Sequence, residues 1–191
     1  MAGETILWRR LDLPGHDRAR LSALGEGWLL TGTAVFLHGG RPCRLDYRVV
    51  CDAAWRTASA TVEGWAGNEP VAAELTADAE RRWRLGGQAQ PQVEGCIDVD
   101  LGFTPATNLL ALRRLDLPVG AEAEARSAWL DFPGFTMGPL PQTYRRTGDT
   151  TYAYESSGGA FTAELLVNEA GFVTHYPGLW QEQREERASP A

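Results

Sequence analysis

Hydrophobic and polar residues alternate along most of the chain, in short runs that glycine-rich turns separate. Because successive side chains of a strand point to opposite faces, this alternation predicts half-buried β-strands. The runs lie at residues 6–10, 18–23, 28–36, 44–51, 55–65, 71–77, 82–85, 93–101, 121–132, 142–146, 151–155, 161–167 and 172–176. About a dozen strands at spacings of roughly 8–12 residues favour an antiparallel barrel or sandwich.

One segment breaks this pattern with the periodicity of a helix. Thr104 and Pro105 carry the signals of an N-cap and a first helical position, and Leu109, Leu112 and Leu115 then fall on one side. Leu110 lies off that side, so the helix needs neighbours around most of its circumference. We therefore predict a mainly β fold, in which a large antiparallel sheet curls around a single short helix and covers its own edges.

The length of 191 residues and the 43% hydrophobic content suit one domain with a sizeable core. We place that domain at residues 1–180 and expect residues 181–191, which are charged and poor in apolar side chains, to be a frayed tail. The net charge of −7 and the lack of a basic cluster disfavour nucleic acid as a partner. The chain also has no lysine, which excludes Schiff-base chemistry and a Walker-A phosphate site.

The three cysteines, Cys43, Cys51 and Cys96, have neither the spacing of a zinc site nor the even number of a disulfide framework. Reduced thiols of this kind indicate a cytoplasmic location. The first five residues lack the features of an export signal, and no apolar run approaches the ~20 residues that span a bilayer. We therefore expect no transmembrane segment.

Carboxylates gather on one face of the predicted strand at 93–101, where Glu94, Asp98 and Asp100 alternate with apolar residues. Asp98 and Asp100 are predicted to lie roughly 7 Å apart, close enough to share a polyol or a cation. The same pattern also fits a half-solvated strand that shows its polar side to water. Arg113, on the helix, is expected either to pair with these acids or to extend its head to solvent.

Several kinds of chemistry can be weighed against these residues. The chain has no serine-nucleophile motif, and its three histidines lack metal-ligand spacing, so we expect no catalytic residue, metal or cofactor. A carboxylate pair suits glycoside hydrolysis, but such acids normally come from separate elements that flank the substrate. Non-covalent recognition of hydroxyl groups needs only carboxylates that accept and guanidinium groups that donate hydrogen bonds. Most of the seven tryptophans are expected in the core, with one or two lining a pocket.

Several segments together resemble the bacterial glycolipid-binding family, formerly a domain of unknown function. They are YRVVCD at 47–52, GCIDVDL at 95–101, TPATN at 104–108, LRRL at 112–115, QTYRR at 142–146, YAY at 152–154 and GFVTHYPGLW at 171–180. The resemblance covers nearly the whole chain. One departure is in the helix, where the family often carries a proline and this chain reads NLLALRR at 108–114.

The resemblance implies a sheet curled into a ring around one helix, remote structural similarity to lipoprotein carriers, a tight homodimer, and an acidic pocket that holds a glycolipid or its sugar head. We accordingly predict non-covalent binding of a glycolipid or another sugar-bearing ligand. The candidate ligand-binding residues are Asp98, Asp100, Glu94, Asp46, Arg48, Asn108 and Arg113. Two alternatives stay open: a hydrolase with an Asp98/Asp100 pair, and a purely structural network of buried ion pairs.

Overall fold

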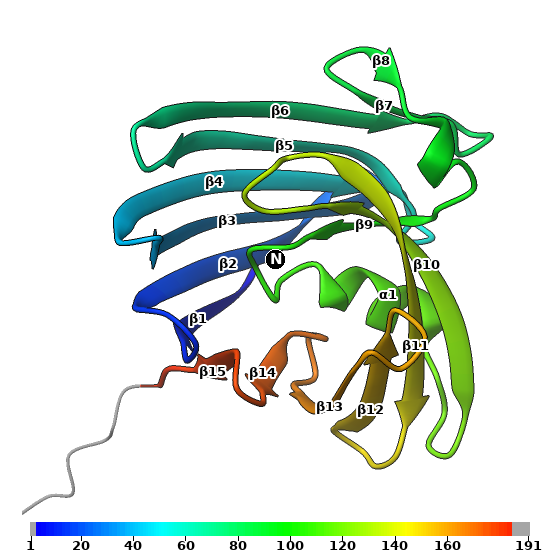
Figure 1. Ribbon diagram of the computed structural model, residues 1–191. Coiled ribbons are helices and arrows are strands. Elements are labelled where there is room, and N and C mark those ends of the chain that lie inside the picture. The colour runs from blue at the N-terminus through cyan, green and yellow to red at the C-terminus, as the bar shows by residue number, and fades with distance from the viewer. Residues whose placement is uncertain (1–2, 185–191) are drawn as a thin grey trace, which may run out of the picture.

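A computed structural model of the chain describes residues 3–184, which form one 15-stranded sheet curled around a helix (Figure 1). The N-terminal half is a meander of β1 (Glu4–Arg10), β2 (Gly15–Leu24), β3 (Gly27–His38), β4 (Arg41–Cys51), β5 (Thr57–Ala66), β6 (Glu69–Ala77), β7 (Trp83–Leu85) and β8 (Gln88–Ala89). The C-terminal half contains β10 (Glu122–Leu130), β11 (Met137–Arg146), β12 (Thr151–Ser156), β13 (Phe161–Val167), β14 (Val173–Tyr176) and β15 (Trp180–Glu182). Between the halves lie the 3-10 helix η1 (Pro91–Val93), the strand β9 (Asp98–Leu101) and the α-helix α1 (Asn108–Leu115).

The two halves of the sheet meet where the first strand pairs with the last. The order is β8-β7-β6-β5-β4-β3-β2-β1-β15-β14-β13-β12-β11-β10-β9. Arg10 of β1 lies opposite Trp180 of β15 in an antiparallel ladder, whereas β9 runs parallel to β10. Within the described residues the sheet stays open, with β8 and β9 as its edges. The predicted mainly antiparallel sheet, curled around one short helix, is confirmed.

The long hairpins follow from their turn residues. Gly39 and Gly40, between β3 and β4, both have positive φ, at 56° and 75°. A two-residue turn of this kind matches the right-handed twist of the flanking strands, and glycine adopts it without steric cost. The strands are therefore not splayed apart by the turn, and β3 and β4 stay paired from Trp28–Cys51 to His38–Arg41.

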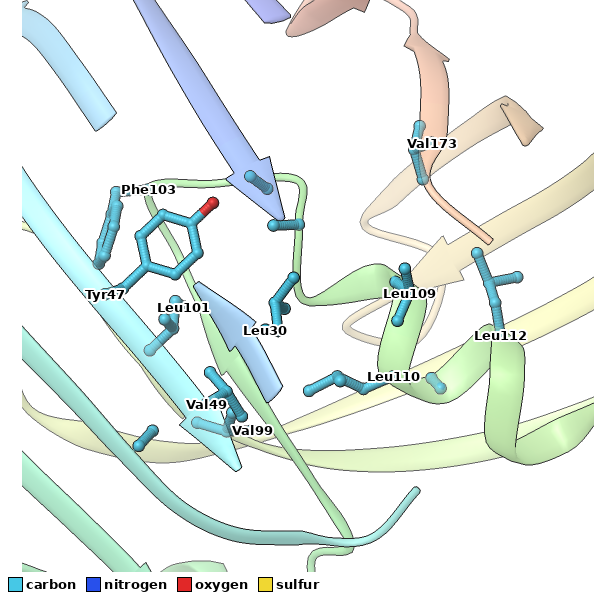
Figure 2. Close-up of a cluster of buried hydrophobic side chains, with 14 of the residues drawn as sticks. Leu30, Tyr47, Val49, Val99, Leu101, Phe103, Leu109, Leu110, Leu112 and Val173 are labelled. Atoms are coloured by element: carbon cyan, nitrogen blue, oxygen red, sulfur yellow. The ribbon is translucent and has the colours of Figure 1, made fainter. Parts of the chain in front are cut away.

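The core fills the hollow of the curl, and β9 and α1 run through it (Figure 2). On β9, Val99 and Leu101 are buried against the inner face of the N-terminal half, near Leu30 and Val49. The first five residues of α1 are also buried, as expected for a helix that is apolar on most sides. This packing holds β9 between the helix and the N-terminal half of the sheet. The polar face of β9 is therefore turned away from those strands, toward α1 and β11.

The helix begins later than its signals predicted. Thr104 accepts a hydrogen bond from the backbone N–H of Ala106, but residues 104–107 form a turn with i→i+3 bonds, and α1 starts at Asn108. Thr107 stands at the N-cap without a side-chain capping bond, because its hydroxyl oxygen instead accepts a hydrogen bond of 3.2 Å from the N–H of Leu101. The turn thus ties the end of β9 to the start of the helix.

The strand that contains the acids is shorter than predicted. Val93 ends η1, Glu94 follows it in a turn, and β9 includes only Asp98–Leu101. The segment before β9 is held by Arg81, whose guanidinium donates to the carbonyls of Thr57 (2.7 Å), Cys96 (3.1 Å) and Ile97 (2.7 Å). Within residues 93–97, the carbonyls of Cys96 and Ile97 thus accept hydrogen bonds from a side chain, while Val93 and Glu94 belong to η1 and the turn after it. The alternation of these residues therefore does not produce a strand.

The start of the expected tail is part of the sheet. Gln181 and Glu182 belong to β15, which pairs with β1 and β14. The part of the expected tail at residues 185–191 lies outside the described residues.

Candidate functional site

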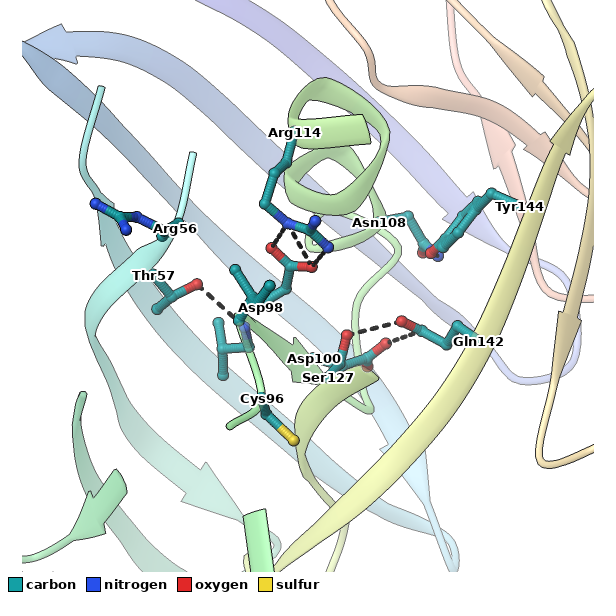
Figure 3. A network of polar contacts seen from close by, with 12 residues as sticks. Arg56, Thr57, Cys96, Asp98, Asp100, Asn108, Arg114, Ser127, Gln142 and Tyr144 are labelled. Atoms are coloured by element: carbon teal, nitrogen blue, oxygen red, sulfur yellow. Dashed lines mark hydrogen bonds and ion pairs between the residues drawn. The ribbon is translucent and has the colours of Figure 1, made fainter. Parts of the chain in front are cut away.

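The inward face of β9 carries two carboxylates that have different partners (Figure 3). Asp98 is 1% exposed and forms a two-pronged ion pair with Arg114 of α1, at 3.0 Å to Nε and 2.6 Å to Nη2. Planar pairs of this kind are strong and geometrically specific. Asp98 therefore fixes the helix to β9, which matches the structural alternative drawn from the sequence.

Asp100, two residues further on, has no cationic partner among the described residues. Its Oδ2 accepts a hydrogen bond of 2.9 Å from Nε2 of Gln142, which also donates to the Tyr154 hydroxyl at 3.0 Å. The Ser127 hydroxyl donates to Oε1 of Gln142 at 2.7 Å and so fixes the orientation of this amide. Burial raises the pKa of the Asp100 carboxyl to about 6, and the nearby negative charge of Asp98 adds to the rise. The hydrogen bond from Gln142 acts in the opposite direction and lowers the pKa.

Asp100 borders a groove of about 290 Å³, here called the aromatic groove. Aromatic side chains from five strands line it: Trp129 of β10, Tyr154 of β12, Phe161 of β13, Tyr176 of β14 and Trp180 of β15. Tyr176 lies 6.0 Å from Tyr154 and 5.9 Å from Phe161, centroid to centroid, in edge-to-face contacts. The rings of these three residues therefore form a continuous wall rather than isolated contacts.

Two of the lining rings stay open to solvent. Trp129 is 36% exposed and Phe161 is 37% exposed. The indole of Trp129 lies directly over Gly102, because a Cβ at that position would stand 2.6 Å from its Nε1. Gly102 therefore lets the ring lie close to the backbone at the edge of the groove.

The start of α1 contributes the polar amide of the aromatic groove. Asn108 is buried and donates through Nδ2 to the Tyr144 hydroxyl at 3.0 Å, as the labelled side chains in Figure 3 show. Its side-chain oxygen makes no hydrogen bond to the described residues, so it is available to a ligand in the groove. Together with the open Oδ1 of Asp100, it gives the groove two hydrogen-bond acceptors beside the aromatic wall.

Behind the aromatic groove lies a further buried carboxyl, Asp17 of β2. The hydroxyl of Tyr47 donates to both of its oxygens at 3.1 Å, and the hydroxyl of Thr104, which lines the groove, donates to Oδ2. Burial raises the pKa of Asp17 to about 7, although both hydroxyl groups act to lower it. The sequence pattern gave no sign of this group, because Asp17 follows a Pro-Gly turn where acids are common.

The structure brings together two of the seven candidate residues, Asp100 and Asn108, at the aromatic groove. Asp98 lies next to them, but its carboxylate is paired with Arg114. Arg113, which was expected to pair with these acids, does not do so. Arg113 is instead exposed and lies 5.1 Å from the ring centroid of Trp55. Arg113 and Arg114 have different partners because adjacent side chains of a helix point about 100° apart, so that only one of them can face Asp98.

The other three candidates lie away from the groove. Asp46 and Arg48 are on the outer face of β4, where Asp46 binds Thr33 at 2.7 Å and Arg44 at 2.6 Å. Glu94 is exposed in the turn after η1. The predicted common face of Glu94, Asp98 and Asp100 is therefore wrong.

Sequence reasoning missed the aromatic wall as a unit. One or two tryptophans were expected to line a pocket, and the structure shows Trp129 and Trp180 doing so. The signal for Tyr154, Phe161 and Tyr176 was present in the alternation of residues 151–155, 161–167 and 172–176. Alternation does not say, however, which strands curl to face one another. Within residues 3–184, no three His, Cys, Asp or Glu side chains converge as a metal site.

A family model described as "Putative glycolipid-binding" matches residues 5–182 of the chain. A Pseudomonas aeruginosa protein, whose crystal structure is described as that of a DUF1089 family protein, is 31% identical; the match covers 95% of this chain and 92% of that one, with a TM-score of 0.76. A beta-barrel-like protein of domain of unknown function DUF1849 from Brucella abortus is 8% identical over 96% of both chains, with a TM-score of 0.55, and shows the fold alone. No curated protein matches. None of the helices that the structure describes is long and apolar enough to cross a membrane.

Proposed function

Because the chain belongs to the family described as "Putative glycolipid-binding", we propose that it binds a glycolipid, or another sugar-bearing ligand, without chemical change. The sugar head occupies the aromatic groove and contacts Asp100 and Asn108. Of the seven residues selected from the sequence, these two are retained as ligand contacts. Asp98 serves the site indirectly, because its ion pair with Arg114 positions β9 against the helix.

The observation that carries this proposal is the combination of aromatic rings with open acceptor oxygens. The C–H groups on the face of a pyranose ring carry partial positive charge, and the faces of aromatic rings carry partial negative charge. Sugar hydroxyls donate to carboxylate and amide oxygens. Trp129 and Phe161, the two lining rings that stay open to solvent, offer aromatic surface, while Asp100 and Asn108 offer the oxygens.

The alternative of a hydrolase finds less support in this geometry. Glycoside hydrolysis needs two carboxyl groups on opposite sides of the scissile bond. Among the described lining residues, Asp100 is the one carboxyl of the aromatic groove, and Asp98 is buried in its pair with Arg114. The arrangement suits binding, as part of glycolipid synthesis or turnover.

The proposal is tested by native mass spectrometry of protein purified without detergent, followed by organic extraction and lipid analysis. We expect a co-purified glycolipid, or binding of added octyl β-glucoside below its critical micelle concentration. Trp129→Ala is expected to weaken that binding about tenfold, since an aromatic contact and its buried area together contribute on the order of 1–2 kcal/mol.

Leu166→Ala is the control, because Leu166 is a 39% exposed apolar residue on β13 that does not line the groove. It should leave the affinity unchanged. An empty protein that also fails to bind the glucoside would refute the proposed function. Equal losses of affinity in the two variants would show that the ligand does not bind in the aromatic groove.

We place this activity in the cytosol. The support is that Cys43, Cys51 and Cys96 are free thiols buried in the core. Proteins of oxidising compartments seldom keep three unpaired cysteines. Labelling with a thiol reagent under denaturing conditions should detect three reactive groups in protein taken directly from cells.

We also propose that the protein is a homodimer, as the family resemblance implies. The outer face of the sheet carries exposed apolar side chains in neighbouring register, Val35 on β3 and Trp65 on β5, on either side of Arg44. Single exposed apolar residues are common, but a cluster of them is typical of interaction surfaces. Light scattering coupled to size exclusion should report twice the mass of one chain.

A further inference from the structure

We propose that the aromatic groove selects an uncharged sugar head and excludes anionic heads, such as those that carry a phosphate or a carboxylate. This inference rests on the proposed function and specifies the class of ligand. It follows from the charges and hydrogen-bonding groups that the aromatic groove presents, taken one at a time.

The first argument is the charge of the lining. Asp100 is the charged side chain of the aromatic groove among the described residues, and no arginine or histidine of that part of the chain borders it. Sites that recognise phosphate or carboxylate rely on guanidinium or ammonium groups and on several N–H donors. A second negative charge beside Asp100 would instead meet like charge in a partly buried site, which is unfavourable.

The second argument concerns the two guanidinium groups nearby, since both are already neutralised. Arg114 is paired with Asp98. Arg10 lies over the ring of Trp180, 5.2 Å from its centroid, and donates to Asp12 through Nε at 2.8 Å and Nη2 at 3.0 Å. Its Nη1 atom is buried and makes no hydrogen bond within the described residues, and Arg10 is not among the residues that line the groove.

The third argument is the hydrogen-bonding character of the groove. Oδ2 of Asp100 is occupied by Gln142, and Oδ1 accepts no bond from the described residues. Asn108 uses its N–H on Tyr144, which leaves its oxygen, and Thr104 uses its hydroxyl proton on Asp17. These three residues therefore offer a ligand acceptor oxygens, which bind hydroxyl donors and gain nothing from an acceptor-only anion. The donors that line the groove are neutral hydroxyl and indole N–H groups, of Tyr154, Tyr176, Ser156, Ser157, Trp129 and Trp180, and none of them carries a positive charge.

The size of the aromatic groove agrees with a head group rather than a lipid tail. Its volume of about 290 Å³ stands at the lower end of the roughly 300–1,000 Å³ usual for small-molecule pockets. The exposed rings of Trp129 and Phe161 lie at its edge, where an apolar aglycone would leave the groove.

A matched pair of ligands tests this inference on the unaltered protein. Octyl β-glucoside and octyl β-glucuronide differ only at carbon 6, where a hydroxymethyl group is replaced by a carboxylate. We expect calorimetric titration at neutral pH, below the critical micelle concentrations, to give a glucuronide affinity at least about tenfold weaker. Asp100→Asn should narrow this difference, whereas Asp46→Asn, on the outer face of β4, should not.

The outcomes separate this inference from the function it rests on. Glucuronide binding as tight as glucoside binding would overturn the selection of uncharged heads and leave glycolipid binding in place. If neither compound binds and no lipid co-purifies, both proposals fail. An Asp46→Asn protein that changes the ratio as much as Asp100→Asn would show that net charge, and not the groove, sets the preference, and would also overturn the inference.

Discussion

Replacing Asp17 by asparagine should make the protein more stable at pH 8 and leave its stability almost unchanged at low pH. Asp17 is fully buried on β2, and its hydrogen bonds come from the hydroxyls of Tyr47 and Thr104. Within residues 3–184 no guanidinium pairs with it. Asparagine reproduces the shape of the protonated acid, and both hydroxyl oxygens can accept from its amide.

The magnitude follows from the pKa of Asp17, about 7 in the folded protein against an ordinary value of 3.8. The folded state binds the proton more tightly, so the contribution of Asp17 is fully present below pH 3.8 and is lost as the pH rises to about 7. A difference of about three in pKa corresponds to a loss of about 4 kcal/mol, since each unit is about 1.4 kcal/mol. The asparagine side chain does not ionise, so the Asp17→Asn variant should avoid this loss.

Urea unfolding of both proteins at about pH 4.5 and about pH 8 measures the effect. About 3 of the 4 kcal/mol should appear between these two conditions, because pH 4.5 already lies above the ordinary pKa of 3.8. Comparing the two proteins at each pH cancels the other titrating groups that both chains share. Asp46→Asn is the control, since Asp46 is on the outer face of β4 and open to solvent. A gap between wild type and Asp17→Asn that stays constant with pH would refute the reasoning.

Three further predictions concern the surroundings of the aromatic groove. Asp98→Asn should lower the free energy of unfolding by about 3–5 kcal/mol in urea melts, because it leaves a part-buried guanidinium unpaired; Arg113→Ala, whose contact is an exposed cation–π pair, should cost about 1 kcal/mol or less. Arg81→Ala should cost several kcal/mol, at about 1.5–3 per charge-assisted bond to its three carbonyls, and Arg81→Lys should not restore it, because an ammonium group lacks the planar fork. Gly102→Ala should displace the indole of Trp129 and weaken glucoside binding several-fold by titration, with the melting temperature nearly unchanged; unchanged affinity would separate that ring from the ligand.

The fold was predictable where local patterns suffice. Strict alternation identified most strands, and the Thr104-Pro105 signal located the turn that leads into the helix. The alternation of residues 93–97 misled, because Arg81, distant in sequence, binds the carbonyls of that segment and keeps it out of the sheet. A local rule has no means of detecting such a contact.

The candidate site was predictable only in part for a similar reason. Asp100 and Asn108 were found because they belong to the one strand-and-helix unit that crosses the core. Asp46 and Arg48 were selected for charged alternation, but the charged side of an antiparallel strand is normally the one that faces water. The aromatic wall depends on how several strands curl toward one another, which no single run of residues reveals.

The ladder between β1 and β15 decides when a folding chain completes the aromatic groove. Strands β1 to β8 pair with their neighbours in sequence, so this part can fold as it leaves the ribosome. The aromatic groove includes Trp180 of β15, and β15 pairs with β14 on one side and with β1, which is distant in sequence, on the other. Closing so long a loop is slow compared with forming a hairpin. The aromatic groove is therefore complete only in a chain in which β1 and β15 have paired.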